Sequence, residues 1–324
     1  MGLLVNGVWK SDWYDTKKSA GGFVRDENVF RQWGGEDTKF KIEPNRYHLY
    51  VSLACPWAHR ALIFRKIKGL EDVISASLVK AEMLENGWCI DDDLSLKLNY
   101  GSSPLEGIEY LREVYLAAKS DYTGRVTVPI LWDKKTDSIV NNESSDIIRI
   151  LNSSFQKYSS SGLDFYPVEY QDEIDKLNSI IYNDVNNGVY RAGFATSQQA
   201  YEKAFLKIFE CLDNLEKRLA TQRYLVGGGV TEADWRLFTT LIRFDVVYYS
   251  HFKTNLKRIE DYPNLSHYVR DLYQYEGVAE TVNFDHIKRH YFYSHQTINP
   301  TRVIPIGPEI DFNRSHNRQE IGLL

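Results

Sequence analysis

Cysteine is scarce in this sequence: the 324 residues include only Cys55, Cys89 and Cys211. So small and odd a set does not form a disulfide framework, and it indicates a reducing compartment. The first residues lack the basic region and apolar core of a signal peptide, and no uninterrupted apolar run approaches the ~20 residues that span a bilayer. We therefore expect a cytoplasmic protein that neither crosses nor binds membranes.

Basic blocks are also missing, and the formal net charge is −5. Nucleic acid and anionic membranes are therefore not expected as partners. The run Gly227-Gly228-Gly229 is not followed by the Gly-Lys-Ser/Thr of a phosphate-binding loop, which argues against a nucleotide. His286 and His290 lie four residues apart on a predicted helix, but no third ligand accompanies them, so we expect no metal.

What the chain does contain is enough apolar sequence for a sizeable core, with 43% hydrophobic residues. Its length favours two domains. Aromatic residues make up 14% and include 22 tyrosines, so a single tyrosine taken at random is more often a packing residue than a ligand contact.

The most informative stretch runs from residue 47 to residue 68. An apolar strand over 47–53 leads into Cys55, and Pro56 opens a helix that Gly69 ends. Proline suits the first helical position because its missing N–H would be unpaired there in any case. Cys55 then lies at the positive end of the helix, where a thiolate is favoured over a thiol.

The helix opening reads Cys-Pro-Trp-Ala, so Ala58 occupies the position of a second, resolving cysteine. A partner sulfur must therefore come from outside the chain, and glutathione is the natural small thiol. The plain alternative is that Cys55 is a buried small hydrophobic residue, which is the more common fate of a lone cysteine. The rest of the chain has to decide between the two.

The predicted elements of the first half follow the order β-α-β, then α, then β-β-α. The strands are expected at 47–53, 73–79, 126–132 and 138–141, and the helices at 56–68, 105–119 and 143–155, with an irregular insertion over 80–104. This order predicts a thioredoxin-like sheet, in which Val128-Pro129 stands where the fold places a cis-proline opposite the cysteine. Residues beyond the Ser/Gly-rich stretch 159–162 show helical periodicity to about residue 290. Among them, Thr231 is followed by acidic residues and is expected to cap a helix over 232–248.

The predicted fold class is thus α/β plus all-α: an N-terminal thioredoxin-like domain followed by a C-terminal helical domain. We expect an N-terminal extension over 1–45, a thioredoxin-like, glutathione-binding domain over 46–157, an all-helical domain over 158–293 and an extended tail over 294–324.

This plan is that of glutathione transferases, and the sequence resembles one branch of them, the glutathionyl-hydroquinone reductases or Xi class. The resemblance rests on residues 21–25, 54–60, 86–88, 127–133, 142–145, 186–195, 285–295 and 298–301. One departure is Arg302, where the family pattern has glycine, which bears only on the conformation of the tail.

The resemblance implies the reduction of S-glutathionyl-hydroquinones by glutathione. Cys55 would attack the sulfur of the adduct, the hydroquinone would leave, and a second glutathione would free the enzyme from the mixed disulfide. The ring carbon must gain a proton when it leaves, so an acid or a keto form of the ring is needed. The family also implies a homodimer.

The resemblance further implies which residues bind the substrates. Val128 and Pro129 would hold the peptide part of glutathione, Glu143 and Ser144 its γ-glutamyl end, and Trp88 and Arg125 would contact the peptide and the glycine carboxylate. Tyr190 and Tyr291 match the ring site and would bind the ring oxygens and supply or relay the proton, with Tyr293 as a further ring contact.

Two alternatives remain open. An omega-like thioltransferase or dehydroascorbate reductase would use the same Cys55 and the same glutathione site, but it would not need Tyr190 and Tyr291. A non-enzymatic binding protein on a transferase scaffold would have no reactive thiol at Cys55.

Overall fold

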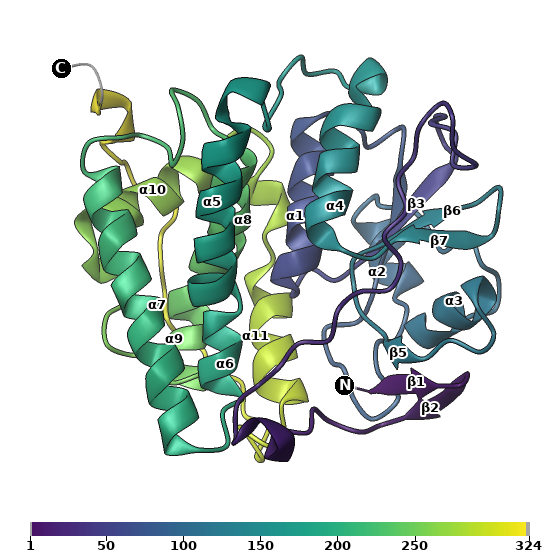
Figure 1. The fold of residues 1–324 in the computed structure, drawn as a ribbon, viewed down its shortest axis with the longest axis horizontal. Coiled ribbons are helices and arrows are strands. Elements are labelled where there is room, and N and C mark those ends of the chain that lie inside the picture. Colours follow the sequence, from purple (N-terminus) through teal and green to yellow (C-terminus); the bar gives the residue numbers. More distant parts are fainter. Residues whose placement is uncertain (1, 322–324) are drawn as a thin grey trace. The chain divides into compact units, whose positions relative to one another are not determined.

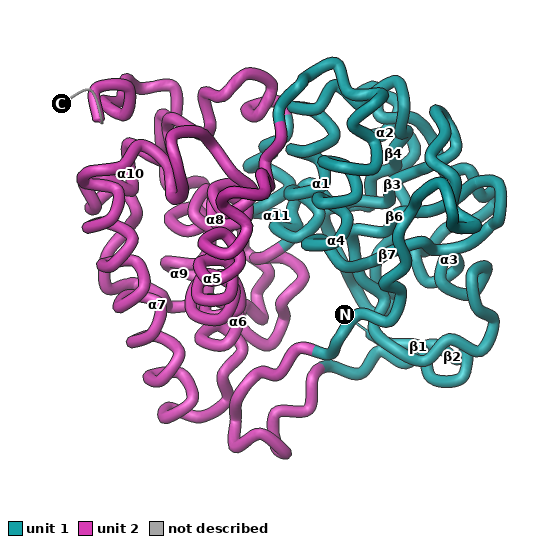
Figure 2. The backbone as a smooth tube through the Cα atoms, turned by 45° about the horizontal axis from the view of Figure 1, so that its top comes forward, with its two compact units in different colours: residues 1–13, 26–163, 281–290 teal, residues 14–25, 164–280, 291–324 magenta. Residues whose placement is uncertain are grey.

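The computed structural model describes residues 2–321 and divides into two compact units, coloured teal and magenta in Figure 2. Unit 1 comprises Met1–Trp13, Asp26–Leu163 and Thr281–His290. Unit 2 comprises Tyr14–Arg25, Asp164–Glu280 and Tyr291–Leu324. The four-part division expected from the sequence stays a prediction.

Unit 1 is built on a four-stranded sheet with the strand order β4-β3-β6-β7. The strands are β3 (Tyr47–Val51), β4 (Ser75–Leu78), β6 (Ile130–Asp133) and β7 (Ser138–Asn141). β3 pairs parallel with β4 and antiparallel with β6, and β6 pairs antiparallel with β7. All residues of β3 and β6 are buried, because helices cover both faces of the sheet. This is the predicted thioredoxin-like arrangement.

The helices of unit 1 pack on this sheet. Figure 1 shows α1 (Pro56–Ile67) and α4 (Ser144–Arg149) side by side on one face, and α3 (Leu111–Ala118) on the other. Two short turns, η2 (Ile150–Ser154) and η3 (Gln156–Tyr158), follow α4. A second sheet of three strands, β2-β1-β5, joins β1 (Leu3–Val5) and β2 (Val8–Lys10) to β5 (Gly124–Arg125). The N-terminal extension is therefore tied to the sheet domain by backbone pairing.

The predicted irregular insertion over 80–104 is wrong in one respect, because it contains a helix, α2 (Asp92–Lys97). Asp91, the first residue of the acidic run 91–93, caps this helix by accepting a hydrogen bond from the Leu94 N–H at 3.1 Å. Asp92 accepts from the Ser103 N–H at 2.9 Å and so fastens the end of the insertion. The next helix begins at Leu111, six residues later than predicted.

Unit 2 is a bundle of helices. Its segments are η1 (Lys17–Ser19), η4 (Val168–Tyr170), α5 (Gln171–Ile181), η5 (Tyr182–Asn186), α6 (Gly188–Gly193), α7 (Gln198–Leu219), α8 (Glu232–Arg243), η6 (Phe244–Tyr248), α9 (Tyr249–His251), η7 (Ile259–Asp261), α10 (Pro263–Tyr273), η8 (Ala279–Thr281) and η9 (Arg318–Glu320). The last helix, α11 (Phe284–Ser294), contributes residues to both units, as does η8. Among residues 2–321, no helix combines the length and the apolar character that a bilayer span requires.

The central helix of unit 2 is α8, in which all twelve residues are buried. It begins as predicted at Thr231, whose N–H and hydroxyl donate to the Asp234 carboxylate at 2.7 and 3.0 Å. The single helix predicted over 232–248 is in fact interrupted, because α8 passes into the π-helical turn η6 and then into α9. π-helical turns of this kind often occur at functional sites.

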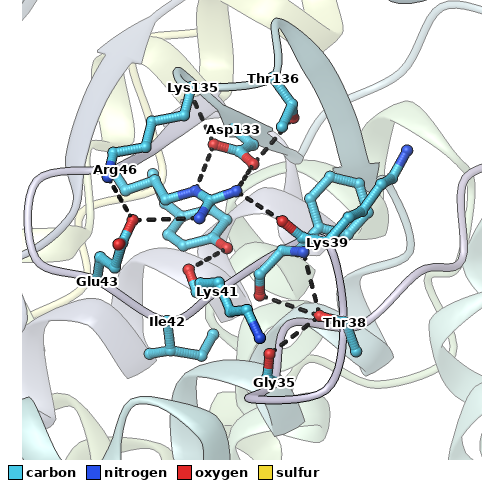
Figure 3. Close-up of polar contacts among 12 residues, drawn as sticks. Gly35, Thr38, Lys39, Lys41, Ile42, Glu43, Arg46, Asp133, Lys135 and Thr136 are labelled. Atoms are coloured by element: carbon cyan, nitrogen blue, oxygen red, sulfur yellow. Dashed lines mark hydrogen bonds and ion pairs between the residues drawn. The ribbon is translucent and has the colours of Figure 1, made fainter.

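A buried ion pair closes one end of the sheet in unit 1 (Figure 3). The Arg46 guanidinium donates to both carboxylate oxygens of Asp133, at 2.8 and 2.5 Å, and also to the Lys39 carbonyl at 2.9 Å. Asp133 further accepts from the Thr136 hydroxyl at 2.9 Å. Burial opposes ionisation of Asp133, but these donors outweigh it and lower the pKa of its carboxyl. The two chain segments before β3 and after β6 are thereby joined.

Removing one member of this pair should destabilise the protein more than removing both. Asp133→Leu leaves the buried Arg46 guanidinium with only the exposed Glu43 carboxylate as an acidic partner, and we expect the free energy of unfolding in urea to fall by about 3 kcal/mol. The double variant Arg46→Met/Asp133→Leu buries no unpaired charge and should lose less. A double variant that is less stable than Asp133→Leu would show that the pair does not carry the effect.

Candidate active site

Cys55 lies where β3 leads into α1. It precedes Pro56, the first residue of α1, and its own backbone is extended, with φ −78° and ψ 123°. Its carbonyl accepts the first hydrogen bond of the helix from the His59 N–H at 2.9 Å. The side chain is partly exposed, and none of the three cysteines forms a disulfide. The thiol is thus at the N-terminal end of a twelve-residue helix, a setting that favours the thiolate.

The residue that faces this thiol is Val128. The Cys55 Sγ lies 3.7 Å from the Val128 carbonyl oxygen, and the Val128–Pro129 peptide bond is cis, which confirms that prediction. Tyr115 holds the preceding residue, because its hydroxyl donates to the Thr127 carbonyl at 2.9 Å and accepts from the Thr127 N–H. Within residues 2–321 the Val128 N–H donates to no protein acceptor. It is therefore available to a bound peptide.

Glu143 and Ser144 open α4. The Glu143 carboxylate accepts from the N–H and the hydroxyl of Ser145, each at 3.0 Å, and from the Asn28 amide at 2.8 Å. Burial would raise the pKa of the Glu143 carboxyl, but these hydrogen bonds and the nearby Arg60 guanidinium outweigh burial and lower it. Arg60 also donates to the Ser144 hydroxyl at 3.3 Å. A carboxylate, a hydroxyl and a guanidinium therefore meet at the start of this helix.

Trp88 is buried and packs against His290 of α11. Its ring stacks on that of His290, with 4.7 Å between centroids and 16° between planes. His290 Nδ1 lies 2.9 Å from the Ala81 carbonyl oxygen, so this imidazole is fixed by the insertion that carries Trp88. Of the two histidines His286 and His290, at least His290 therefore has a packing role. Among the described residues, no group of three His, Cys, Asp or Glu side chains could hold a metal.

Arg125 is held by the N-terminal extension. Its guanidinium donates to the carbonyls of Asp12 and Trp13, at 2.7 and 3.3 Å, and to the Asp26 carboxylate at 3.3 Å. A glycine carboxylate would have to share the guanidinium with these acceptors. The role of Arg125 in binding glutathione stays a prediction.

Three tyrosine hydroxyls form a chain inside unit 2. The Tyr291 hydroxyl lies 2.6 Å from that of Tyr190 and 2.9 Å from that of Tyr248. Tyr190 is on α6, Tyr248 ends η6 and Tyr291 is on α11. Burial and the neighbouring phenols raise the pKa of Tyr291 well above its ordinary value, whereas Arg243 acts to lower it. Tyr291 is therefore a neutral phenol at physiological pH, able to donate one hydrogen bond and accept another.

Arg25 and Asn187 lie beside Tyr190, at one end of this chain of tyrosine hydroxyls. The Arg25 guanidinium lies over the Tyr190 ring, 5.0 Å from its centroid, and donates to the Asn187 side-chain oxygen at 2.9 Å. Sequence reasoning missed Arg25 as a functional candidate, although it lies within one of the family-like segments. It also missed Tyr248, whose only signal is its position near the end of a buried aromatic helix.

Tyr293 does not join the hydroxyl chain among the residues that the structure describes. Its ring instead lies under the Arg302 guanidinium at 5.1 Å. Arg302 has φ +57°, a left-handed conformation that costs glycine little and other residues more. This conformation explains why the family pattern has glycine at that position, and the cation–π contact partly offsets the strain.

The proposed site residues thus form two groups. Cys55, Trp88, Arg125, Val128, Pro129, Glu143 and Ser144 belong to unit 1, and Tyr190, Tyr291 and Tyr293 belong to unit 2. Residues 54–154 match the glutathione S-transferase N-terminal domain, and residues 198–271 match the C-terminal domain. The glutathionyl-hydroquinone reductase PcpF of Sphingobium chlorophenolicum is 54% identical to this chain in sequence. The similarity covers 95% of this chain and 96% of the PcpF chain.

The chain belongs to the glutathionyl-hydroquinone reductases, the Xi class of glutathione transferases. Two solved structures are similar to this chain over nearly its whole length. The glutathione-bound structure of YqjG from Escherichia coli K-12 has 50% identity and a TM-score of 0.88, covering 98% of this chain and 99% of that one. The Xi-class transferase of Natrialba magadii has 45% identity and a TM-score of 0.91, covering 99% of this chain and 97% of that one.

The charge of Glu143 has a measurable consequence for the stability of the protein. Its folded-state pKa is lowered, so its contribution to stability is present above the unfolded value of about 4.3 and is lost as the pH falls through the folded value. We expect Glu143→Gln to be less stable than the wild type by about 1.5 kcal/mol at pH 7, with the difference shrinking as the pH falls below about 5.

Urea unfolding at several pH values would measure this difference. The matched control is Glu106→Gln, at an exposed carboxylate of the same unit, which should follow the wild type at every pH. A constant difference between Glu143→Gln and the wild type across the pH range would contradict the expectation.

Proposed function

We propose that this protein reduces S-glutathionyl-hydroquinones to hydroquinones, with glutathione as co-substrate and glutathione disulfide as second product. The observation that carries the proposal is the Cys55 thiol at the N-terminal end of α1, 3.7 Å from the Val128 carbonyl beside cis-Pro129. The names of the similar proteins, a glutathionyl-hydroquinone reductase and a glutathione-bound transferase, support the substrate class.

The reaction proceeds by two displacements at sulfur. In the first, the Cys55 thiolate attacks the glutathione sulfur of the adduct, the sulfur–aryl bond breaks, and its electron pair passes to the ring carbon, which takes up a proton. The products are the hydroquinone and a mixed disulfide between Cys55 and glutathione. In the second, a glutathione thiolate attacks this disulfide, forms glutathione disulfide and restores the Cys55 thiolate. Ala58 offers no sulfur, so an external thiol is required.

Glutathione is held, in this proposal, by unit 1. The Val128 N–H and C=O pair with the cysteinyl part of the peptide as one strand pairs with another. Ser144 and the opening turn of α4 receive the γ-glutamyl carboxylate, and the ionised Glu143 pairs with the ammonium group. Trp88 covers the peptide, and Arg125 attracts the glycine carboxylate.

The hydroquinone ring is bound, in this proposal, by Tyr190 and Tyr291, with Tyr293 as an outer contact. When Tyr248 donates to Tyr291 and Tyr291 donates to Tyr190, the Tyr190 proton is directed away from the chain and toward a ligand. Each phenol can pass on a proton and be reprotonated by the next one. Arg243 favours the negative charge that develops on Tyr291. We further propose a homodimer in the cytoplasm.

Cys55 can be tested by turnover and by mass spectrometry. Cys55→Ala and Cys55→Ser should both lose reduction of glutathionyl-benzohydroquinone, because neither side chain can form the mixed disulfide. The controls Cys89→Ala and Cys211→Ala should keep it. After exposure to glutathione disulfide, the wild type should carry one glutathione on Cys55 until glutathione is added. Near-wild-type turnover in Cys55→Ala, or an intramolecular disulfide, would contradict the monothiol mechanism.

The tyrosine chain can be tested by comparing two substrates. Tyr190→Phe and Tyr291→Phe keep the rings and remove the hydroxyls, so they should slow the reduction of the aryl adduct by about tenfold to a thousandfold. Reduction of a small disulfide needs no acid, because a thiolate leaves unaided, and it should change only a few-fold. Tyr248→Phe tests the far end of the chain of hydroxyls and should slow the reduction of the aryl adduct less. Equal losses on both substrates would favour the thioltransferase alternative.

A further inference from the structure

Unit 1 is completed by Thr281–His290, a segment from late in the chain that Figure 2 shows in the colour of that unit. Its later residues lie on α11, where the Arg289 Nε donates to the Glu82 carboxylate at 2.8 Å. Burial would raise the pKa of the Glu82 carboxyl, but this contact with Arg289 outweighs burial and lowers it. An ion pair therefore joins α11 to the insertion over 80–104.

The His290 imidazole makes two contacts with the same insertion. Its Nδ1 lies 2.9 Å from the Ala81 carbonyl oxygen, and because a carbonyl can only accept, Nδ1 carries a proton and donates it to this bond. Its ring stacks on the Trp88 indole, with 4.7 Å between centroids and 16° between planes. The hydrogen bond fixes the rotation of the imidazole, and the nearly parallel rings then fix the plane of the indole.

The backbone at Trp88 is held independently of His290. The Trp88 carbonyl accepts from the Leu111 N–H at 2.9 Å, and the Gly87 N–H donates to the Leu84 carbonyl at 3.0 Å. The indole has no comparable anchor, because its N–H donates to no acceptor within residues 2–321. The orientation of the indole thus rests on packing, in which His290 covers one face of the ring, and the indole N–H is left to donate to a ligand.

We propose that His290 is a positioning residue for glutathione, because it fixes the plane of the Trp88 indole before the peptide arrives. The inference rests on the proposed function, in which Trp88 covers glutathione. An indole that is already in place loses little rotational freedom when glutathione binds, whereas a mobile indole would lose more and bind more weakly. This role acts through Trp88, so it sets the affinity for glutathione and leaves the reactivity of the Cys55 thiolate unchanged.

Three substitutions separate the two contacts of His290. His290→Phe keeps a ring against the indole and removes the donor to Ala81. His290→Asn keeps an N–H that can donate to Ala81 and removes the stacked ring. His290→Ala removes both contacts.

The measurement is the Kd of S-methylglutathione, an analogue without a reactive thiol, by isothermal titration calorimetry. We expect His290→Ala to raise the Kd about tenfold, His290→Asn to behave like His290→Ala, and His290→Phe to stay within about threefold of the wild type. Rescue by phenylalanine, which cannot donate to Ala81, would show that the stacked ring sets the affinity.

The matched control is His286→Ala, one turn earlier on α11. His286 is also buried, but within the described chain its ring does not stack on Trp88, so its loss should leave the Kd unchanged. Alkylation of Cys55 across the pH range should give the same thiol pKa in every variant as in the wild type. A general disturbance of unit 1 would change that pKa as well.

Three outcomes would overturn the positioning role of His290. They are wild-type affinity in His290→Ala, an equal loss of affinity in His290→Ala and His286→Ala, and a Kd for His290→Phe as high as that for His290→Ala. The Kd does not depend on turnover. A wild type that binds S-methylglutathione but does not reduce glutathionyl-benzohydroquinone would therefore contradict the reductase proposal while leaving the role of His290 to be decided by these variants.

Discussion

The antiparallel pairing of β3 with β6 is the constraint on which the candidate active site depends. Tyr47 lies opposite Asp133 and Tyr50 opposite Ile130, so continuing the register brings the residues after β3 next to Val128 and Pro129. The bidentate bond between Arg46 and Asp133 fastens the other end of the same pair of strands. A slip of one residue would move the strands by about 3.3 Å and turn their side chains to the opposite face. The 3.7 Å contact between Cys55 and Val128 thus depends on the register of β3 and β6, which the ion pair at the far end of the strands reinforces.

Interactions between residues close in sequence made much of the fold around the candidate active site predictable. The proline at the first helical position, the acidic first turn at Thr231 and the glycine after α1 each act within a few residues, so their effects can be derived without knowing the fold. The cis-proline needed more, since the dipeptide by itself is seldom cis, and only the order of strands and helices pointed to it. The thioredoxin-like sheet followed from that order, and its strand boundaries moved by up to four residues.

The sequence could not predict the partners that come from far along the chain. Asn28 reaches Glu143 across 115 positions, and Tyr190 reaches Tyr291 across 101. Nothing in either local pattern indicates such a partner, because a single asparagine in an irregular segment or one tyrosine among 22 has no periodicity to mark it. Arg125 is a further case, because nothing in the sequence indicated that the N-terminal extension supplies its guanidinium with three acceptors.

The division of the chain into units has a consequence for how the protein is made. Each unit consists of three separate segments, and unit 1 includes Thr281–His290, where His290 stacks on Trp88. During synthesis the sheet can pair once β7 has left the ribosome, but His290, the partner of the Trp88 indole, is made only about 150 residues later. The nascent sheet domain is therefore incomplete until almost the whole chain has emerged, and a fragment that ends at residue 163 would expose a tryptophan to chaperones and proteases.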